Sequence, residues 1–196
     1  MCCKIVQESG PGDYLAALSA DLGRLFQDPA GPPGRAAPQR GPWAIHRLSQ
    51  APAVDRISWG CTPNRRQHQP VSDAHLGMLL RGHAFWWPLL SQRVLVPVDG
   101  WYEPAAGGRR LPRYFHRRDG EPIYIAGIAA WRPEGARAPP RGLAIITDRP
   151  VQARQNAPAQ PVVLPAEAAL AWIDPATPII DALQLACVPW RGDGRP

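Results

Sequence analysis

A short apolar run rich in valine, residues 93–98, predicts a buried strand. An Asp-Gly dipeptide at 99–100 interrupts the run, because glycine adopts backbone angles that other residues resist. An extended continuation then places Trp101 and Glu103 on one face of the chain and Tyr102 on the other. The pattern therefore places a carboxyl group beside an indole at the end of a strand. The indole would exclude solvent from the carboxyl group and so raise its pKa toward neutrality.

Similar patterns predict the remaining elements. Strands are expected at 1–6, 43–48, 54–61, 113–116, 122–128, 142–147, 161–164 and 183–189, with 113–116 and 122–128 paired around an Asp-Gly turn at 119–120. Helices are expected at 13–26, with Asp13 as N-cap, at 73–87 and at 166–173. Many short strands and few helices indicate an α/β fold of the α+β type. We expect a strongly bent, barrel-like, mixed or antiparallel sheet with peripheral helices.

Composition adds limits on the class of protein. A chain of 196 residues is predicted to form a single domain, 1–196. Its 25 prolines and 18 glycines favour loops, and residues 28–42 are expected to form a mobile Pro/Gly-rich loop. The net charge of +6 and the eight tryptophans favour an acidic partner with stackable bases, such as single-stranded nucleic acid.

Targeting and metal signals are weak in this sequence. It has no apolar run of about 18 residues and no basic-then-apolar N-terminus, so neither a membrane span nor a signal peptide is predicted. Four cysteines without a C-x-x-C pair suit a reducing cytoplasm and do not suggest a metal site. We expect no metal and no cofactor.

Cys2 has a chemistry of its own. A small second residue permits removal of Met1, which would leave an amine and a thiol on adjacent carbons of Cys2. Such a 1,2-aminothiol condenses with an aldehyde to an imine and then closes a five-membered thiazolidine ring. Neither an internal cysteine nor a lysine can close that ring.

A second feature is the aromatic residue Trp59, followed by a basic loop. Trp59, Pro63, Arg65 and Arg66 could form a base-stacking wedge with phosphate contacts. The alternative is a core tryptophan before a solvated loop.

The order of these elements resembles that of the SOS response-associated peptidase family. The matching motifs are Met1-Cys2, Trp59-Gly60 with Pro63, the 93–103 segment, Ala126-Gly127-Ile128 with Trp131, Ile146-Thr147, and the segments 161–164 and 172–175.

The resemblance implies a function in the DNA damage response. It implies binding of single-stranded DNA by a monomer, and covalent capture of abasic sites through a Cys2 thiazolidine. Glu103 would handle the proton transfers, and Cys2 could also remove an N-terminal extension by autocatalysis, as a thiol peptidase. A cytoplasmic protein of bacterial or phage origin is expected, associated with the nucleoid when bound to DNA.

Two motifs depart from the family pattern. The family has Asn-Ala-Arg where this chain has Asp73-Ala74-His75, so Asp73 becomes a candidate catalytic residue and His75 replaces a phosphate-binding arginine. The family His-x-Arg-Met-Pro corresponds to residues 157–161, which lack the imidazole, although His75 could supply one. The candidate DNA contacts are Trp59, Pro63, Arg65, Arg66, His75, Trp101, Arg109, Arg110, Arg154 and Asn156.

Two alternatives follow from these departures. The chain could be a degenerate member that binds DNA without a covalent bond or serves another partner. It could instead be an N-terminal-nucleophile hydrolase that cleaves an amide.

Overall fold

The computed structural model describes residues 4–25, 41–48, 51–61, 70–103, 112–130, 142–149 and 159–189. The predicted loop at 28–42 lies almost wholly outside the described residues. Within the described ranges, no helix is long and apolar enough to cross a membrane.

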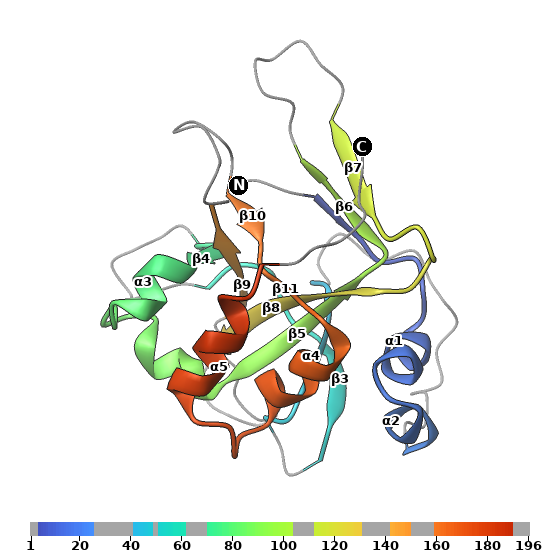
Figure 1. Cartoon of the computed structure of the whole chain (residues 1–196), viewed down its shortest axis with the longest axis horizontal. Coiled ribbons are helices and arrows are strands. Elements are labelled where there is room, and N and C mark those ends of the chain that lie inside the picture. The colour runs from blue at the N-terminus through green and yellow to red at the C-terminus, as the bar shows by residue number, and fades with distance from the viewer. Residues whose placement is uncertain are drawn as a thin grey trace.

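Two sheets form the framework (Figure 1). The larger has eight strands in the order β10-β9-β8-β5-β2-β3, with β11 on β8 and β4 on β9. Its strands are β2 Trp43–His46, β3 Ala53–Arg56, β4 Asp73–His75, β5 Arg93–Val98, β8 Ile123–Ala130, β9 Gly142–Asp148, β10 Gln160–Pro161 and β11 Val163–Leu164. Among the described strand pairs of this sheet, only β4 with β9 is parallel, and all the others are antiparallel. The first and last strands of the sheet do not pair with each other. The predicted α+β class with a mixed sheet is therefore confirmed, but the sheet does not close into a barrel.

β5 is the central strand that the sequence predicted, and its bounds agree with the prediction. All six of its residues are buried, and it pairs with β8 on one side and β2 on the other. An apolar run without alternation suits a strand covered on both faces.

The smaller sheet has the order β1-β6-β7, from β1 Lys4–Val6, β6 Gly100–Glu103 and β7 Arg113–His116. It extends beyond the edge of the larger sheet (Figure 1). The predicted pairing of 113–116 with 122–128 was wrong, because β7 pairs with β6 and β8 lies between β5 and β9. β8 is buried at every residue and fits only a sheet interior, whereas β7 is exposed at both ends.

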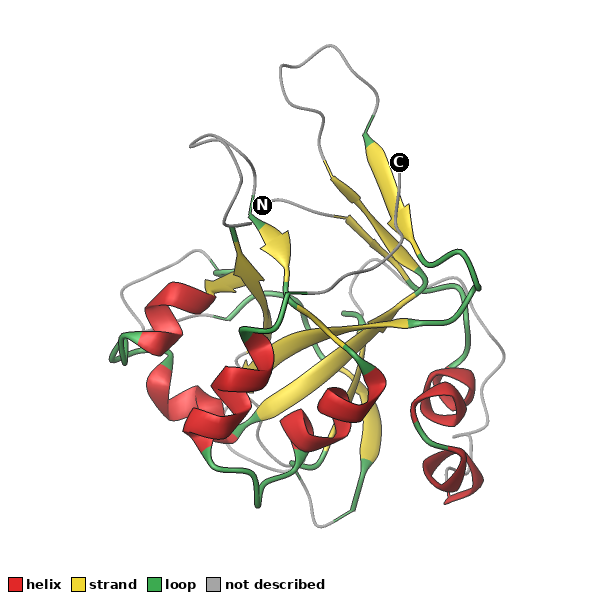
Figure 2. Ribbon diagram, in the orientation of Figure 1, coloured by secondary structure: helices red, strands yellow, loops and turns green. Residues whose placement is uncertain are grey.

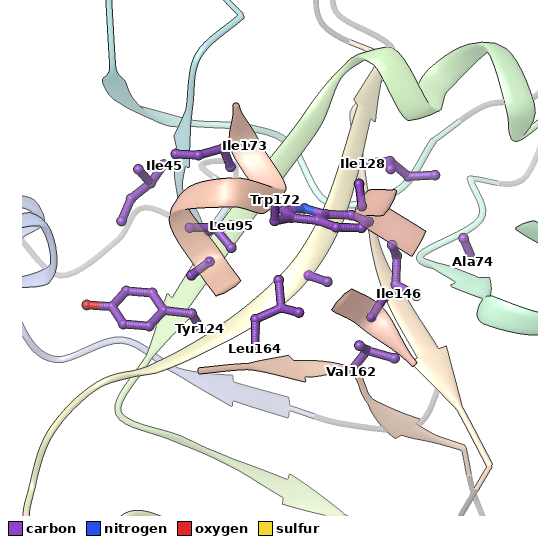
Figure 3. Close-up of a cluster of buried hydrophobic side chains, with 14 of the residues drawn as sticks. Ile45, Ala74, Leu95, Tyr124, Ile128, Ile146, Val162, Leu164, Trp172 and Ile173 are labelled. Atoms are coloured by element: carbon purple, nitrogen blue, oxygen red, sulfur yellow. The ribbon is translucent and has the colours of Figure 1, made fainter. Parts of the chain in front are cut away.

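Helices lie around the periphery of the sheets (Figure 2). They are α1 Pro11–Leu18, α2 Ala20–Leu25, α3 Leu76–Leu80, the 3-10 helix η1 Trp87–Ser91, α4 Ala166–Ile173 and α5 Ile179–Ala186. α4 matches its predicted bounds and buries Trp172. Figure 3 shows this indole among Leu95, Ile128, Ile146 and Leu164, at the centre of the main apolar cluster.

The predicted helix at 13–26 is two helices, α1 and α2. The helix begins at Pro11, and Asp13 is its third residue, whose carboxylate accepts the Gly10 N–H at 3.0 Å. Asp13 is therefore not the N-cap. Ser19 has an extended backbone that separates α1 from α2, while Tyr14 and Leu18 are buried as the spacing predicted.

The predicted helix at 73–87 was also wrong over most of its length. Asp73–His75 is a strand that pairs in parallel with β9. α3 begins only at Leu76, where the His75 Nδ1 accepts the Gly77 N–H at 3.1 Å, and Gly82 follows it with a φ of +68°. Asp73–His75 is extended because it pairs with β9, which is distant in sequence, and the local spacing of apolar residues carries no information about that pairing.

Two further predictions needed correction at the C-terminal end. The segment 161–164 is two strands, β10 on β9 and β11 on β8, because the chain changes neighbour at Val162. The strand expected at 183–189 is instead the end of α5, which buries Ala182, Leu183 and Ala186 at helical spacing.

Candidate active site and nucleic-acid interface

Glu103 is the last residue of β6 and is buried, with 6% of its surface exposed. Trp101 lies on the same face at 2% exposure, and its Nε1–H donates to Glu103 Oε1 at 3.3 Å. Tyr102 takes the opposite face at 38% exposure. The alternation predicted for this segment is confirmed, and it leaves a carboxyl group in a largely dry environment.

Burial raises the pKa of Glu103 above its ordinary value. Three groups oppose this effect: hydrogen bonds from the Trp101 indole and the Gln160 side chain, and the charge of Arg113. Burial is the largest contribution, so the net shift is upward. A carboxyl held in this way gives up and takes back a proton nearer to neutral pH than an exposed glutamate does.

The N-terminal strand runs directly beside this carboxyl group. β1 pairs with β6 in antiparallel register, with Lys4 opposite Tyr102 and Ile5 opposite Trp101. Cys2 lies outside the described residues. In the sequence, Cys2 precedes Lys4 by two residues.

The segment that follows β1 is fastened to the larger sheet at two points. The Gln7 side chain donates to the carbonyls of Trp43 at 3.0 Å and Pro97 at 2.6 Å, and accepts the Trp43 N–H at 2.9 Å. These bonds tie the N-terminal segment to β2 and β5.

The second point is the Asp99 carboxylate. It accepts the backbone N–H groups of Glu8 and Ser9, the Ser9 hydroxyl at 2.8 Å and the Tyr14 hydroxyl at 2.7 Å. Burial alone would raise the Asp99 pKa, but these donors outweigh it and lower the pKa below its ordinary value. Gln7 and Asp99 together hold β1 in register with β6.

A second apolar cluster lies under Trp101. It consists of Ala44, Ile57, Val94, Val96, Val98, Trp101, Ile123, Ile125, Ala129, Leu143, Ile145 and Val163. Asp73 and His75 pair with Ile145 and Thr147, so all four point to the face of β9 that carries this cluster. The fold thus brings Asp73 and His75 to the face of the larger sheet that Trp101 covers.

His75 is the last residue of β4, and its partner Thr147 lies near the end of β9. The His75 Nε2 is 3.9 Å from Asp148 Oδ1, and both side chains are partly exposed. On the other side of β9, Gln160 pairs with Asp148, and its side chain reaches Glu103. Asp73 accepts a bond from the Ser72 hydroxyl at 3.2 Å.

Thr147 is 1% exposed, and its hydroxyl has no hydrogen-bond partner within the described part of the chain. An unsatisfied buried hydroxyl is costly unless a ligand or water completes it. Thr147 and Gln160 both lie in segments compared with the family motifs, but neither was predicted from the sequence to be a site residue. The polar residue that directly precedes Pro161 was the available signal for Gln160.

Trp59 packs against the second cluster, and its indole N–H donates to the Ser72 carbonyl at 2.9 Å. It also forms a bridge with Leu143. These contacts fix the indole next to Asp73.

The remaining candidates, Cys2, Pro63, Arg65, Arg66, Arg109, Arg110, Arg154 and Asn156, lie outside the described residues. Among the residues that are described, no group of three or more His, Cys, Asp or Glu side chains could hold a metal ion. The described cysteines, Cys61 and Cys187, are free thiols.

Sequence comparison gives two matches. A family model described as SOS response associated peptidase (SRAP) matches residues 1–193. The chain is also similar to the abasic site processing protein YedK of Escherichia coli K12, with 27% identity over an alignment of 205 residues. The alignment covers 96% of this chain and 88% of YedK.

Structural comparison agrees with the sequence matches. A phage-related protein of Bordetella bronchiseptica superposes with a TM-score of 0.75 at 32% identity, covering 94% of this chain and 87% of its own. A second protein of the same organism gives a TM-score of 0.68 at 20% identity, covering 98% and 96%. A Bacteroides thetaiotaomicron protein gives 0.58 at 19% identity, covering 75% and 68%. The last two show likeness of fold alone.

Proposed function

Because the chain belongs to the SOS response-associated peptidase family, we propose that it captures abasic sites in single-stranded DNA by a covalent bond to Cys2. Three observations support this. The Escherichia coli relative is named for abasic site processing, the net charge of +6 suits a polyanion, and a buried carboxyl group ends the strand next to β1.

Cys2 is the proposed nucleophile, after removal of Met1. Its amine adds to the aldehyde carbon of the ring-opened sugar and gives a carbinolamine. Loss of water leaves an imine, the thiol sulfur adds to the imine carbon, and the nitrogen takes the thiol proton. The product is a thiazolidine, in which the former aldehyde carbon carries one C–N and one C–S bond, and one water is released for each ring formed.

Glu103 is the proposed acid and base for these steps. Its protonated form gives a proton to the carbinolamine hydroxyl so that water can leave, and the carboxylate then takes a proton back. The raised pKa keeps a larger protonated fraction near neutral pH than an exposed glutamate would have. Trp101 shields the imine from bulk water on the same face.

Polar groups at the end of β9 are proposed to hold the sugar and its phosphates. The Thr147 hydroxyl needs a partner, and His75 and Asp73 point to the same face. His75 can donate to a phosphate oxygen from Nε2, because Nδ1 accepts the Gly77 N–H. Asp73 can accept a hydrogen bond from a sugar hydroxyl but repels phosphate.

The register of β1 with β6 is the observation that carries the proposal. Lys4 lies opposite Tyr102, next to Glu103 in sequence, and Cys2 is two residues from Lys4. This short covalent link from β1 to Cys2 supports the proposal that the aminothiol acts beside the buried carboxyl group.

A denaturing gel with an oligonucleotide that carries one abasic site tests the proposal. The parent protein, processed to Cys2, should give a heat-stable shifted band, and Cys2→Ala should give none. Glu103→Gln should slow formation by about 100-fold or more, the usual value of a positioned acid–base group. Intact mass verifies that Met1 has been removed.

Other outcomes distinguish the alternatives. Native binding without a heat-stable band would identify a member that binds DNA non-covalently. Equal cross-linking by Cys2→Ala and parent would exclude the thiazolidine. Turnover of an amide substrate without any DNA product would favour the hydrolase.

A further inference from the structure

The outer face of the small sheet carries aromatic side chains that the proposed capture does not use. Tyr102 and Tyr114 pair across β6 and β7, with ring centroids 4.6 Å apart and 34° between their planes. Tyr114 and His116 follow on β7, with centroids 5.3 Å apart at 20°. These three residues form a row on the face opposite Trp101 and Phe115, and we call them the aromatic row.

The row is open to solvent and is fixed in place by the backbone. Tyr102 and His116 are exposed and Tyr114 is partly exposed. The Tyr114 ring lies across Gly100, where a Cβ would meet its Cζ and hydroxyl oxygen at 2.6 Å. Glycine at position 100 therefore lets the ring lie against the sheet.

Charge on this face is positive where the row meets the N-terminus. Lys4 is exposed and is the cross-strand partner of Tyr102, so the two side chains project from the same face of the small sheet. Glu8 and Asp99 are the acidic groups near Tyr114. The Asp99 carboxylate accepts its bonds from neutral groups of Glu8, Ser9 and Tyr14, so it keeps its negative charge, and the positive charge of this face lies at its Lys4 end.

We infer that the aromatic row binds single-stranded DNA by stacking on bases next to the captured nucleotide, with Lys4 on a neighbouring phosphate. The inference rests on the proposed function, because the same strands carry Glu103 on one face and Tyr102 on the other. A nucleotide bound at the end of β1 and β6 has neighbours that can continue around this edge onto the row. The proposal thus adds a second contact surface to the capture site.

Stacked rings on adjacent strands suit nucleic acid well. Aromatic side chains on neighbouring strands of a sheet can stack two or three bases of a single strand. Stacking accepts any base, since every base has a flat π-face. A damage-capturing protein needs this tolerance, because abasic sites arise in any sequence.

The test measures the affinity of the processed full chain for an undamaged oligothymidylate of about 15 nucleotides, by fluorescence anisotropy. Tyr102→Leu should weaken binding by about five- to a hundredfold, the range for loss of one stacked base. Tyr102→Phe keeps the ring and should stay within about twofold of the parent. Trp87→Leu, which removes an exposed indole on η1, is the matched control and should bind like the parent.

Salt dependence separates the stacking from the charge. Tyr102→Leu should leave the slope of log K against log salt unchanged, because a tyrosine is neutral. Lys4→Gln should reduce the magnitude of the slope by about 0.7, the value of one phosphate contact to a single strand. Near-identical melting temperatures of parent and variants verify that the fold is intact.

The inference would be overturned if Tyr102→Leu bound DNA as tightly as the parent, or if Tyr102→Phe lost as much DNA affinity as Tyr102→Leu. It would also be overturned if the aromatic row bound a partner protein while the Tyr102 variants kept the DNA affinity of the parent. If the parent cross-links an abasic oligonucleotide but Tyr102→Leu shows no loss, the inference fails and the proposed function stands. A parent that neither binds nor cross-links DNA would overturn both.

Discussion

Gln160 shows how a single side chain can adjust the proposed acid–base group. Its amide donates to the Glu103 carboxylate from the larger sheet, while Glu103 belongs to the smaller one. The bond favours the ionised form and partly offsets the effect of burial. Gln160 therefore positions Glu103 across the junction of the two sheets.

Replacing Gln160 by Leu should raise the pKa of Glu103 further, because a donor to the carboxylate is lost. Ionisation of Glu103 gives one limb of the pH–rate profile for cross-linking. This limb should move to higher pH in Gln160→Leu, because a higher pH is then needed to ionise the same fraction of Glu103. Single-turnover rates over a pH series measure this. Glu103→Gln is the control and should lack that limb, whereas an unmoved limb in Gln160→Leu would show that the amide does not act on Glu103.

Asp99 is the second residue whose ionised state matters. Its carboxylate gathers four donors from residues 8, 9 and 14, so Asp99→Ala should lower the free energy of unfolding by about 2–4 kcal/mol. The folded pKa is lowered from 3.8, so this stabilisation is complete above the unfolded pKa and is lost as pH falls through the folded pKa.

Urea unfolding at neutral pH and at a pH of about 3 checks the sign. The difference between parent and Asp99→Ala should be large at neutral pH and should shrink in acid. A constant difference would mean that the charge of Asp99 is not what stabilises the N-terminal segment.

At the scale of elements, Arg93 joins β5 to the helical layer. Its guanidinium donates to the carbonyls of Leu90, Trp172, Asp174 and Thr177, which belong to η1, the end of α4 and the turn before α5. Arg93→Met should destabilise the protein by about 3–5 kcal/mol, because several buried carbonyls lose their donor.

Arg47→Met is the matched control for this effect. Arg47 is 3.8 Å from the Asp174 carboxylate in a partly exposed ion pair, and its loss should cost less than about 1 kcal/mol. Equal destabilisation by the two variants, measured by urea unfolding, would contradict the role given to the Arg93 bonds.

The local pattern of apolar and polar residues predicted correctly those helices and strands whose secondary structure does not depend on pairing with distant parts of the chain. Residues 93–98 form a continuous apolar run and residues 166–173 have a helical pattern, and the predicted bounds match β5 and α4. Asp73–His75 became a strand because β9 pairs with it, a contact with residues about 70 positions away in sequence. The strand predicted at 183–189 was wrong for a different reason. The segment considered began at residue 183 and so omitted the first turn of α5, which begins at Ile179.

The candidate site was predictable only in part, for a similar reason. Alternation placed Trp101 and Glu103 on one face, and the fold agrees. Gln160 reaches Glu103 only because β10 and β6 meet across two sheets, a relation that no local spacing encodes. Thr147 likewise stands out only through its burial without a partner in the described structure.

At the scale of the whole molecule, the net charge of +6 should dominate non-specific affinity for DNA. Binding of single-stranded DNA should weaken steadily with salt, with a slope of about 0.7 per phosphate contact. We expect a smaller slope than for a relative that has Asn and Arg at positions 73 and 75 and Arg at position 159. Anisotropy titrations from low to physiological salt measure it, and affinity that ignores salt would exclude nucleic acid as the ligand.

The pairing of β1 with β6 also has a consequence for timing during synthesis. The partner of Lys4 is Tyr102, so β1 leaves the ribosome long before its neighbour exists. At about 5–20 residues per second, roughly 100 residues take about 5–20 s. During that interval the N-terminus has no β6 to pair with and stays open to the enzymes that trim the initiator methionine. The same topology that later pairs β1 with β6 thus first leaves time for the proposed nucleophile to be made.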